Sequence, residues 1–364
     1  MPDYIHELPD WPQFVWNHET VAAPLASARH KQGRLLGQME ALGFKVREEA
    51  VLRTLTDDVL KSSEIEGEKL DAEQVRSSVA RRLGMDIGGL KPADRNVEGV
   101  VEMMLDAAQR YDQPLTEDRL FGWHAALFPT AHRIKVGAWR NDSMAPMQVA
   151  SGPVGRERVH FEAPPAARLE EEMRRFLEWF NGDATTEPVL KAAQAHLWFV
   201  TIHPFDDGNG RIARAIADMA LARSEESTQR FYSMSAQVRQ DRSDYYRILE
   251  QTQQASMDIT AWVEWFLACL TQAIEGAHSA LAGVITKARY WETLRDVPLN
   301  DRQRLVINRL LDGFEGTLTT SKWATLTKSS QDTALRDMQQ LVERGVLIRN
   351  PAGGRSTSYS LVAV

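Results

Sequence analysis

Cysteine is almost absent: the chain of 364 residues contains one, Cys269, so it cannot form an internal disulfide. A single thiol within an apolar run is typical of an inert core residue in a reducing compartment. No apolar run approaches the roughly 20 residues that a membrane helix needs. The first residues also lack the apolar segment of a secretory signal. We therefore expect a cytoplasmic protein without a membrane contact.

Positive charge is also scarce, with 43 Lys and Arg against 50 Asp and Glu, which leaves a formal net charge of −7. This balance excludes a protein whose whole surface serves nucleic acid or an anionic membrane, so any such contact has to be local. One cysteine and scattered histidines provide no zinc-binding pattern. The length predicts two or three domains.

The densest group of reactive side chains lies at residues 203–214, which read His-Pro-Phe-Asp-Asp-Gly-Asn-Gly-Arg-Ile-Ala-Arg. Gly208 and Gly210 allow a backbone turn that approaches an oxyanion closely. The apolar spacing after Gly210 predicts a buried helix, whose N-terminus would direct free N–H groups at the same oxyanion. The pattern therefore favours a phosphate ligand.

The charged residues of this stretch fit a nucleoside triphosphate. Arg211 and Arg214 lie three residues apart, so both can reach one polyanion from the first turns of the helix. Asp207 would repel the phosphates unless it holds a Mg²⁺ ion that they share. His203 is suited to take a proton from an attacking hydroxyl. Singly, each residue has a plainer interpretation, as a loop histidine, a helix cap or a turn; their joint occurrence favours the site.

The whole stretch resembles the signature of Fic-domain proteins, His-x-Phe-x-(Asp or Glu)-Gly-Asn-Gly-Arg-x-x-Arg, and meets every fixed position of it. The resemblance implies a helical enzyme that transfers AMP from ATP to a Ser, Thr or Tyr hydroxyl of a protein, with Mg²⁺ as cofactor. The roles that it implies are general base for His203, metal ligand for Asp207, and nucleotide binding for Gly208, Asn209, Gly210, Arg211 and Arg214.

A second motif lies upstream at residues 62–67, Ser-Ser-Glu-Ile-Glu-Gly. Alone it is a polar helix end with a glycine stop. Together with the Fic signature it resembles the inhibitory pattern of that family, (Ser or Thr)-x-x-x-Glu-(Gly or Asn), at Ser62, Glu66 and Gly67. The resemblance implies that Glu66 pairs with Arg214 and keeps it from the terminal phosphate of ATP. It also allows Glu66 to position a water that removes AMP from a modified protein.

Two further regions are candidates for ligand contacts. Residues 146–161 combine glycine and proline with short β-prone pieces, which predicts a hairpin. This region resembles the flap on which Fic proteins align a protein substrate by strand addition, with a purely structural turn as the alternative. Tyr245 and Tyr246 are predicted to stack on or hydrogen-bond the adenine, with simple packing an equal alternative.

The predicted fold is mainly α, a Fic helical core with a small β-hairpin flap. We expect an N-terminal helical region with the inhibitory helix at 1–89, the catalytic core at 90–270, a helical connector at 271–297, and a unit at 298–364 that is similar to a winged helix-turn-helix. The basic bias of the last unit is weak, so DNA binding and protein contact or dimerisation stay equally open. Fic proteins often form homodimers, and the N-terminal region could do so here.

The motifs and the predicted parts are compatible with two functions. The favoured one is an ATP-dependent protein adenylyltransferase, self-modification included, that is autoinhibited by Glu66. The alternative is a DNA-binding transcriptional regulator whose core senses nucleotide. An intact His203 favours the enzyme, because a sensor needs no base.

Overall fold

The computed structural model describes most of the chain, namely residues 4–40, 42–85, 91–131, 134–141, 145–153, 156–182, 184–254, 256–311, 314, 316–351 and 357–362. Its elements are mainly helices, with two small antiparallel hairpins, which confirms the predicted mainly α class. None of the helices in these ranges has the length and apolar character needed to cross a membrane. The chain divides into two compact units, residues 1–277 and 278–364.

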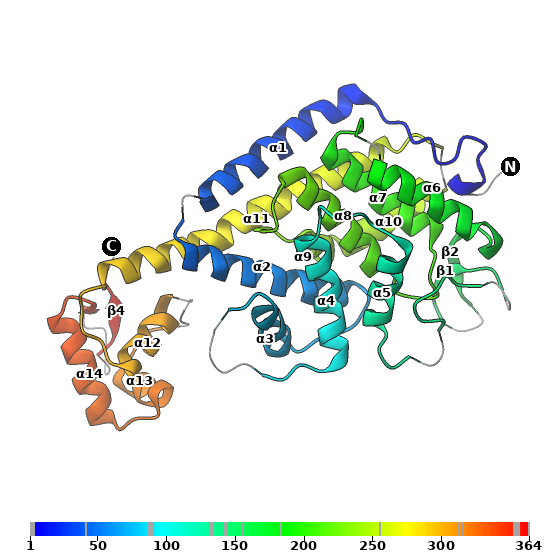
Figure 1. Cartoon of the computed structure of the whole chain (residues 1–364). Coiled ribbons are helices and arrows are strands. Elements are labelled where there is room, and N and C mark those ends of the chain that lie inside the picture. The colour runs from blue at the N-terminus through cyan, green and yellow to red at the C-terminus, as the bar shows by residue number, and fades with distance from the viewer. Residues whose placement is uncertain are drawn as a thin grey trace. The chain divides into compact units, whose positions relative to one another are not determined.

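The first unit is built of helices (Figure 1). Their bounds are α1 (His18–Glu40), α2 (Phe44–Ile65), α3 (Ala72–Arg82), α4 (Arg95–Gln109), α5 (Glu117–Leu127), α6 (Leu169–Gly182), α7 (Pro188–Ile202), α8 (Asn209–Glu225), α9 (Met234–Gln240), α10 (Arg242–Gln253) and α11 (Thr260–Thr293), with short 3-10 turns at Ile5–Glu7 and Ala166–Arg168.

The centre of this unit is the antiparallel pair α7 and α8, which pack on each other along their length (Figure 1). Helix α7 starts with Pro188 at its first turn, and the Glu187 carboxylate caps the N–H groups of Val189 and Leu190 at 2.9 Å each. Nearly every later side chain of α7 is buried, because the sequence is apolar on all faces. The loop between the two helices is therefore anchored in the core at both ends.

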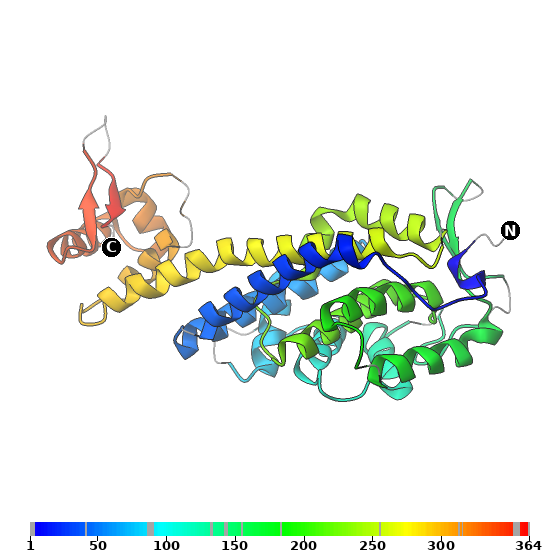
Figure 2. The ribbon, with the colours of Figure 1, turned by 90° about the horizontal axis from the view of Figure 1, so that it is seen from above.

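The long helices α1 and α2 connect the N-terminal region to this centre. Helix α1 runs beside α11 (Figures 1 and 2), and Lys31 of α1 forms an ion pair with Glu275 of α11 at 2.5 Å. Helix α2 packs against α9 and contacts α8. This packing carries the C-terminal end of α2, with Ser62 and Glu66, to the start of α8.

The predicted hairpin is present as strands β1 (Gln148–Ser151) and β2 (Arg158–Glu162). They pair antiparallel with Gln148 opposite Glu162 and Ser151 opposite Arg158, and the register shifts between Val149 and Ala150. Within the predicted flap region 146–161, residues 154 and 155 lie outside the described ranges.

The predicted limit between the N-terminal helical region and the catalytic core, at residues 89 and 90, lies outside the described residues. The limit between 270 and 271 falls inside α11, a continuous helix of 34 residues, whereas the contacts divide the chain after Ala277. The division into four parts stays a prediction.

The second unit, described by itself, contains α12 (Asp301–Leu311), α13 (Thr320–Thr327) and α14 (Gln331–Glu343), followed by β3 (Leu347–Arg349) paired antiparallel with β4 (Tyr359–Leu361). Its core includes Val306, Ile307, Trp323, Met338 and Leu341. Three helices followed by a hairpin is the predicted order of elements. The winged-helix assignment itself, and with it DNA contact, stays a prediction.

Candidate active site

The loop between α7 and α8 has a tightly specified backbone. His203 ends α7 in the left-handed region at φ 52°, and Gly208 begins α8 at φ 79°. The side chain of the buried Asn209 spans the loop: its Oδ1 accepts from the Phe205 N–H at 3.0 Å, and its Nδ2 donates to the Phe205 carbonyl at 2.8 Å. The N-cap residue of α8 is Gly208, so it provides no side-chain cap for this helix. Its first N–H groups are thus available to an anion.

His203 is held as a neutral base. Its Nδ1 lies 3.1 Å from the Val200 carbonyl, which only accepts, so Nδ1 carries the proton and Nε2 keeps its lone pair. Burial and, to a smaller extent, the nearby Arg140 guanidinium lower the pKa of His203 to about 4, against the opposing effect of the Val200 hydrogen bond. Arg140 also positions the loop, because its Nε donates to the His203 carbonyl at 2.7 Å and its backbone N–H to Pro204 at 2.9 Å.

The two adjacent carboxylates have different environments. Asp206 Oδ2 accepts the Lys135 N–H at 2.8 Å, which makes it part of the loop scaffold. Asp207 is exposed, and its Oδ1 accepts from the Gly208 N–H at 2.6 Å. No cluster of three metal-binding side chains occurs in the described residues. One carboxylate fits a Mg²⁺ ion that arrives with phosphates, because this ion often keeps waters and binds few protein ligands.

Arg214 is held by the inhibitory motif. The guanidinium is 4% exposed; its Nε donates to Ser62 Oγ at 3.0 Å, and its Nη2 to the Ser62 carbonyl at 2.9 Å and to Glu66 Oε1 at 2.8 Å. Glu66 also lies against Gly210, where a Cβ atom would stand 2.3 Å from Glu66 Oε1. Gly67 follows at φ 87°, a conformation that favours glycine and turns the chain away from α2. Ser62 and Glu66 therefore both contact α8, and Gly67 follows them at the turn.

Arg211 has an acidic partner that the sequence did not reveal. Its Nη1 donates to Glu68 Oε2 at 2.7 Å, and its guanidinium lies 5.0 Å from the centre of the Phe128 ring. Glu68 directly follows the inhibitory motif, at a position that the motif leaves undefined. Both arginines predicted to bind phosphate are therefore paired with carboxylates of the segment that ends α2.

Replacing Glu68 with glutamine is expected to raise nucleotide binding modestly. The Glu68 side chain is 48% exposed, so solvent weakens its pair with Arg211. Such pairs contribute about 1 kcal/mol at most, which corresponds to roughly a fivefold lower Kd for ATP. Isothermal titration of ATP with Mg²⁺ measures this change. An unchanged Kd would show that Arg211 does not contact the nucleotide.

Residues of the α7–α8 loop, α10 and the hairpin surround a cavity of about 820 Å³. This volume is within the roughly 300–1,000 Å³ typical of small-molecule sites. Of the predicted site residues, those that line it are Glu66, His203, Asp207, Gly208, Asn209, Gly210, Tyr245 and Tyr246. Ser62, Gly67, Arg211 and Arg214 do not line it. Tyr245 is buried, and its hydroxyl lies 2.9 Å from His196 Nε2. Tyr246 is partly exposed beside the Arg242 guanidinium. The hairpin residues from Met147 to Ser151 form another wall.

The sequence of the loop region matches a known family. Residues 114–221 match the profile of the Fic/DOC family. This chain contains a Fic domain. Residues 4–85, which include the inhibitory motif, match the profile of a domain of unknown function (DUF4172).

Relatives and solved structures agree with this assignment. The protein adenylyltransferase Fic of Nematostella vectensis is 25% identical over 237 residues, which cover 62% of this chain and 49% of that protein. The protein of the same name from Drosophila melanogaster is 34% identical over 105 residues, 28% of this chain and 20% of that protein. The chain thus spans half or less of the length of these relatives. The crystal structure of a Fic family protein from Desulfovibrio desulfuricans shares the fold, with a TM-score of 0.55 and 22% identity, covering 100% of this chain and 98% of that one.

A buried acidic cluster lies one helical turn beyond the contact of Arg214 with Ser62, between α2 and α8. Asp58 of α2 accepts from Ser233 Oγ at 2.5 Å and from the Ser235 N–H at 3.2 Å. Asp218 of α8 accepts from Arg230 through Oδ1 at 3.1 Å. Asp218 Oδ2 is buried, and no hydrogen-bond partner for it lies among the described residues. Asp58 and Asp218 are both buried, and the charge of Asp58 acts on Asp218, so acidic groups of α2 and α8 interact in the core.

Asp218 is expected to make stability depend on pH. Burial, and then the charge of Asp58, raise the pKa of Asp218 well above its ordinary 3.8, against the opposing effect of Arg230. The folded chain therefore keeps a proton that the unfolded chain loses above pH 3.8, so stability is full below that pH and falls as pH rises toward the folded pKa. Asp218→Asn can keep the hydrogen bond from Arg230 to Oδ1 without the titration. Over this range wild type should lose up to about 1.4 kcal/mol per pH unit relative to the variant in chemical denaturation; parallel curves would contradict the raised pKa of Asp218.

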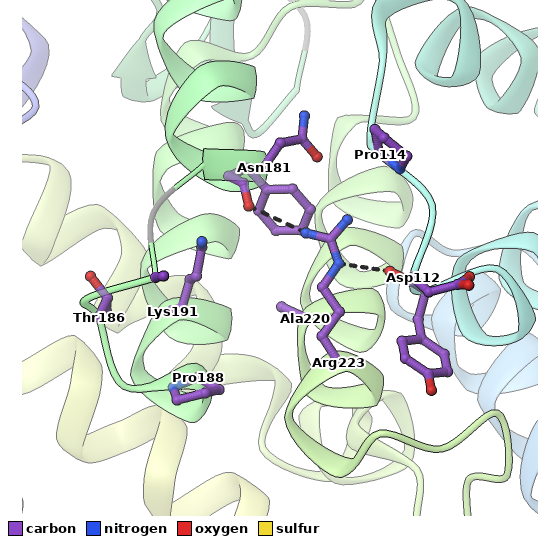
Figure 3. A pocket seen from close by; sticks show the side chains of 11 residues that line it. Asp112, Pro114, Asn181, Thr186, Pro188, Lys191, Ala220 and Arg223 are labelled. Carbon is purple, nitrogen blue, oxygen red and sulfur yellow. Dashed lines mark hydrogen bonds between the residues drawn. The ribbon is translucent and has the colours of Figure 1, made fainter.

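A second cavity, of about 550 Å³, lies at the other end of α8 (Figure 3). Arg223 crosses it and donates to the carbonyls of Tyr111, Phe180 and Gln113 at 2.7, 3.2 and 2.9 Å. Burial and, to a smaller extent, the nearby Arg119 lower the pKa of Arg223 to about 10. Its guanidinium is thus used to satisfy backbone carbonyls, and we assign this cavity no catalytic role.

Proposed function

We propose that the Fic domain transfers AMP from ATP to a hydroxyl of a protein, with self-modification included, and that Glu66 restrains the transfer. The observation that carries the proposal is the base at His203, a neutral ring in the wall of the same cavity as Asp207 and the uncapped start of α8. The relatives named protein adenylyltransferase support it. The intact base favours this function over a nucleotide-sensing regulator.

The chemistry follows from these positions. The target hydroxyl gives its proton to His203 Nε2 and attacks the α-phosphorus in line, and pyrophosphate leaves. The N–H groups at the start of α8 stabilise the charge that develops on the phosphate oxygens. Asp207 would hold Mg²⁺, which neutralises phosphate charge when it is bound. Tyr245 and Tyr246 would contact the adenine, and the hairpin would align the protein substrate by strand addition.

Inhibition would act through Arg214. While Glu66 and Ser62 occupy its guanidinium, Arg214 cannot clamp the terminal phosphate, and ATP binds weakly or in an unreactive pose. Glu66 lies against Gly210, so it excludes phosphate from the space beside the turn. The same carboxylate would position a water for the removal of AMP from a modified protein.

The remaining parts of the proposal concern partners and location. The second unit would contact DNA or another protein, the chain would form a homodimer, and it would act in the cytoplasm. A titration of DNA binding against salt tests the first of these, because phosphate contacts lose affinity steeply as salt rises.

Intact-mass analysis tests the function directly. Incubating the full chain with ATP and Mg²⁺ should add the mass of one or more AMP groups to the protein, strongly in variants freed of Glu66. If ATP binds and no variant gains AMP in itself or in added proteins, the proposed transfer is wrong.

A further inference from the structure

Three side chains form a hydrogen-bonded chain at the hairpin. Ser151 Oγ, at the end of β1, lies 2.6 Å from His160 Nε2 in β2. His160 Nδ1 lies 2.9 Å from Glu250 Oε2 in α10. Serine, histidine and carboxylate in this order are the arrangement that activates a hydroxyl as a nucleophile.

The direction of these hydrogen bonds follows from Glu250. Burial acts to raise its pKa, but hydrogen bonds from His160 and Arg158 lower the pKa of Glu250 overall. The Arg158 Nη2 to Glu250 Oε1 distance is 2.7 Å. The ionised carboxylate can only accept, so His160 Nδ1 donates to it. In the neutral ring Nε2 then accepts the Ser151 hydroxyl proton, and His160 is oriented as a base toward Ser151.

The serine lies in the proposed nucleotide site. Ser151, His160 and Glu250 line the same cavity as His203 and the Gly208–Gly210 turn. Ser151 is exposed, so a phosphorus atom can approach its oxygen. Ser243 lines this cavity and is exposed as well, but among the described contacts it has no histidine partner. Ser151 is therefore distinguished from Ser243 by its base.

We propose that Ser151 is a self-modification site, whose hydroxyl accepts AMP from ATP bound in this cavity; this inference rests on the proposed function and names an acceptor for it. A bond forms between Ser151 Oγ and the α-phosphorus, and the bond from that phosphorus to the bridging oxygen of pyrophosphate breaks. The hydroxyl proton moves to His160 Nε2, and pyrophosphate leaves with the electron pair. The product is a phosphodiester between Ser151 and adenosine.

Peptide mapping of the full chain tests this assignment. The Glu66→Gly variant is incubated with ATP and Mg²⁺, digested, and the AMP fraction is measured at Ser151, at Ser243 and at every other hydroxyl. We expect Ser151 to carry at least about ten times more AMP than Ser243, because Ser151 has a histidine within hydrogen-bonding distance and Ser243 has none among the described contacts. Ser151→Ala should remove this signal, and the AMP that remains on the chain should lie at other hydroxyls.

The role of His160 is tested by His160→Gln in the same background. Loss of the base should slow AMP addition at Ser151 by about 100-fold, the lower end of what general bases contribute. If His160 had a merely structural role, its loss would slow AMP addition at all acceptors alike. The deciding quantity is therefore the rate of AMP addition at Ser151 divided by the rate at the other modified hydroxyls.

The outcomes separate the two proposals. AMP at other hydroxyls with none at Ser151, or equal AMP at Ser151 and Ser243, overturns the assignment and leaves AMP transfer intact. An unchanged Ser151 ratio in His160→Gln overturns the activation by His160. No AMP on any residue of a variant that binds ATP overturns the proposed function, and the Ser151 assignment with it.

Discussion

Replacing Glu66 with glycine is expected to raise AMP transfer by roughly 100-fold. The Glu66 side chain is 29% exposed and its partner Arg214 only 4%, so the pair lies largely out of water. Breaking a pair of this kind changes the free energy by on the order of 3 kcal/mol, and here the change frees Arg214 for the terminal phosphate. Initial rates of AMP gain, followed by intact mass with ATP and Mg²⁺, measure the effect.

Glu64 provides a matched control. Its side chain is also 29% exposed and lies two residues away, but it pairs with Lys61 at 2.8 Å and Arg239 at 3.4 Å instead of the α8 arginines. Glu64→Gln should therefore leave AMP transfer at the wild-type rate. Equal activation by changes at Glu64 and Glu66 would mean that α2 had merely loosened, and the competition for Arg214 would be the wrong explanation.

Replacing His203 with alanine in the Glu66→Gly background is expected to lower AMP transfer to hydroxyls other than Ser151 by at least about 1,000-fold, within the range that general bases contribute. ATP binding should persist, because the turn and the arginines are unchanged. Since the pKa of His203 is lowered to about 4, the parent variant should show a nearly constant rate from about pH 6 to pH 8. Rates over this range, with ATP affinity measured in parallel, separate loss of chemistry from loss of binding.

His30 is the control for the histidine change. It is an exposed residue of α1 that lines neither described cavity, so His30→Ala should leave the rate unchanged. If His203→Ala retains AMP transfer to hydroxyls other than Ser151, or if the rate at these hydroxyls rises steeply through neutral pH, a different group takes the proton from the target hydroxyl.

Much of the fold and of the site was predictable because it depends on local patterns. The helical periodicity, the hairpin and the turn at Gly208 each follow from residues a few positions apart. The fixed spacing of His203, Asp207 and Arg214 also places them around one loop and one helix start, whatever the rest of the chain does. The mainly α class was correct for the same reason.

The contacts between distant segments could not be predicted in this way. Arg211 and Glu68 are separated by 143 positions, and His160 and Glu250 by 90. Whether such side chains meet depends on the rotation and depth at which helices pack, which no local spacing specifies. From the sequence alone, a carboxylate beside a helix end that faces water cannot be distinguished from one that pairs with an arginine.

The sequence by itself identified the residues that we propose to bind and activate a nucleotide, because that chemistry is concentrated in one loop. Only the tertiary structure decided that Arg211 and Arg214 are both paired with carboxylates, that Asp58 acts on the buried Asp218, and that His160 lies within hydrogen-bonding distance of Ser151. Each of these contacts forms only if α2, α8, α10 and the hairpin pack against one another in one arrangement. The packing free energy that selects this arrangement comes from contacts spread over the whole first unit.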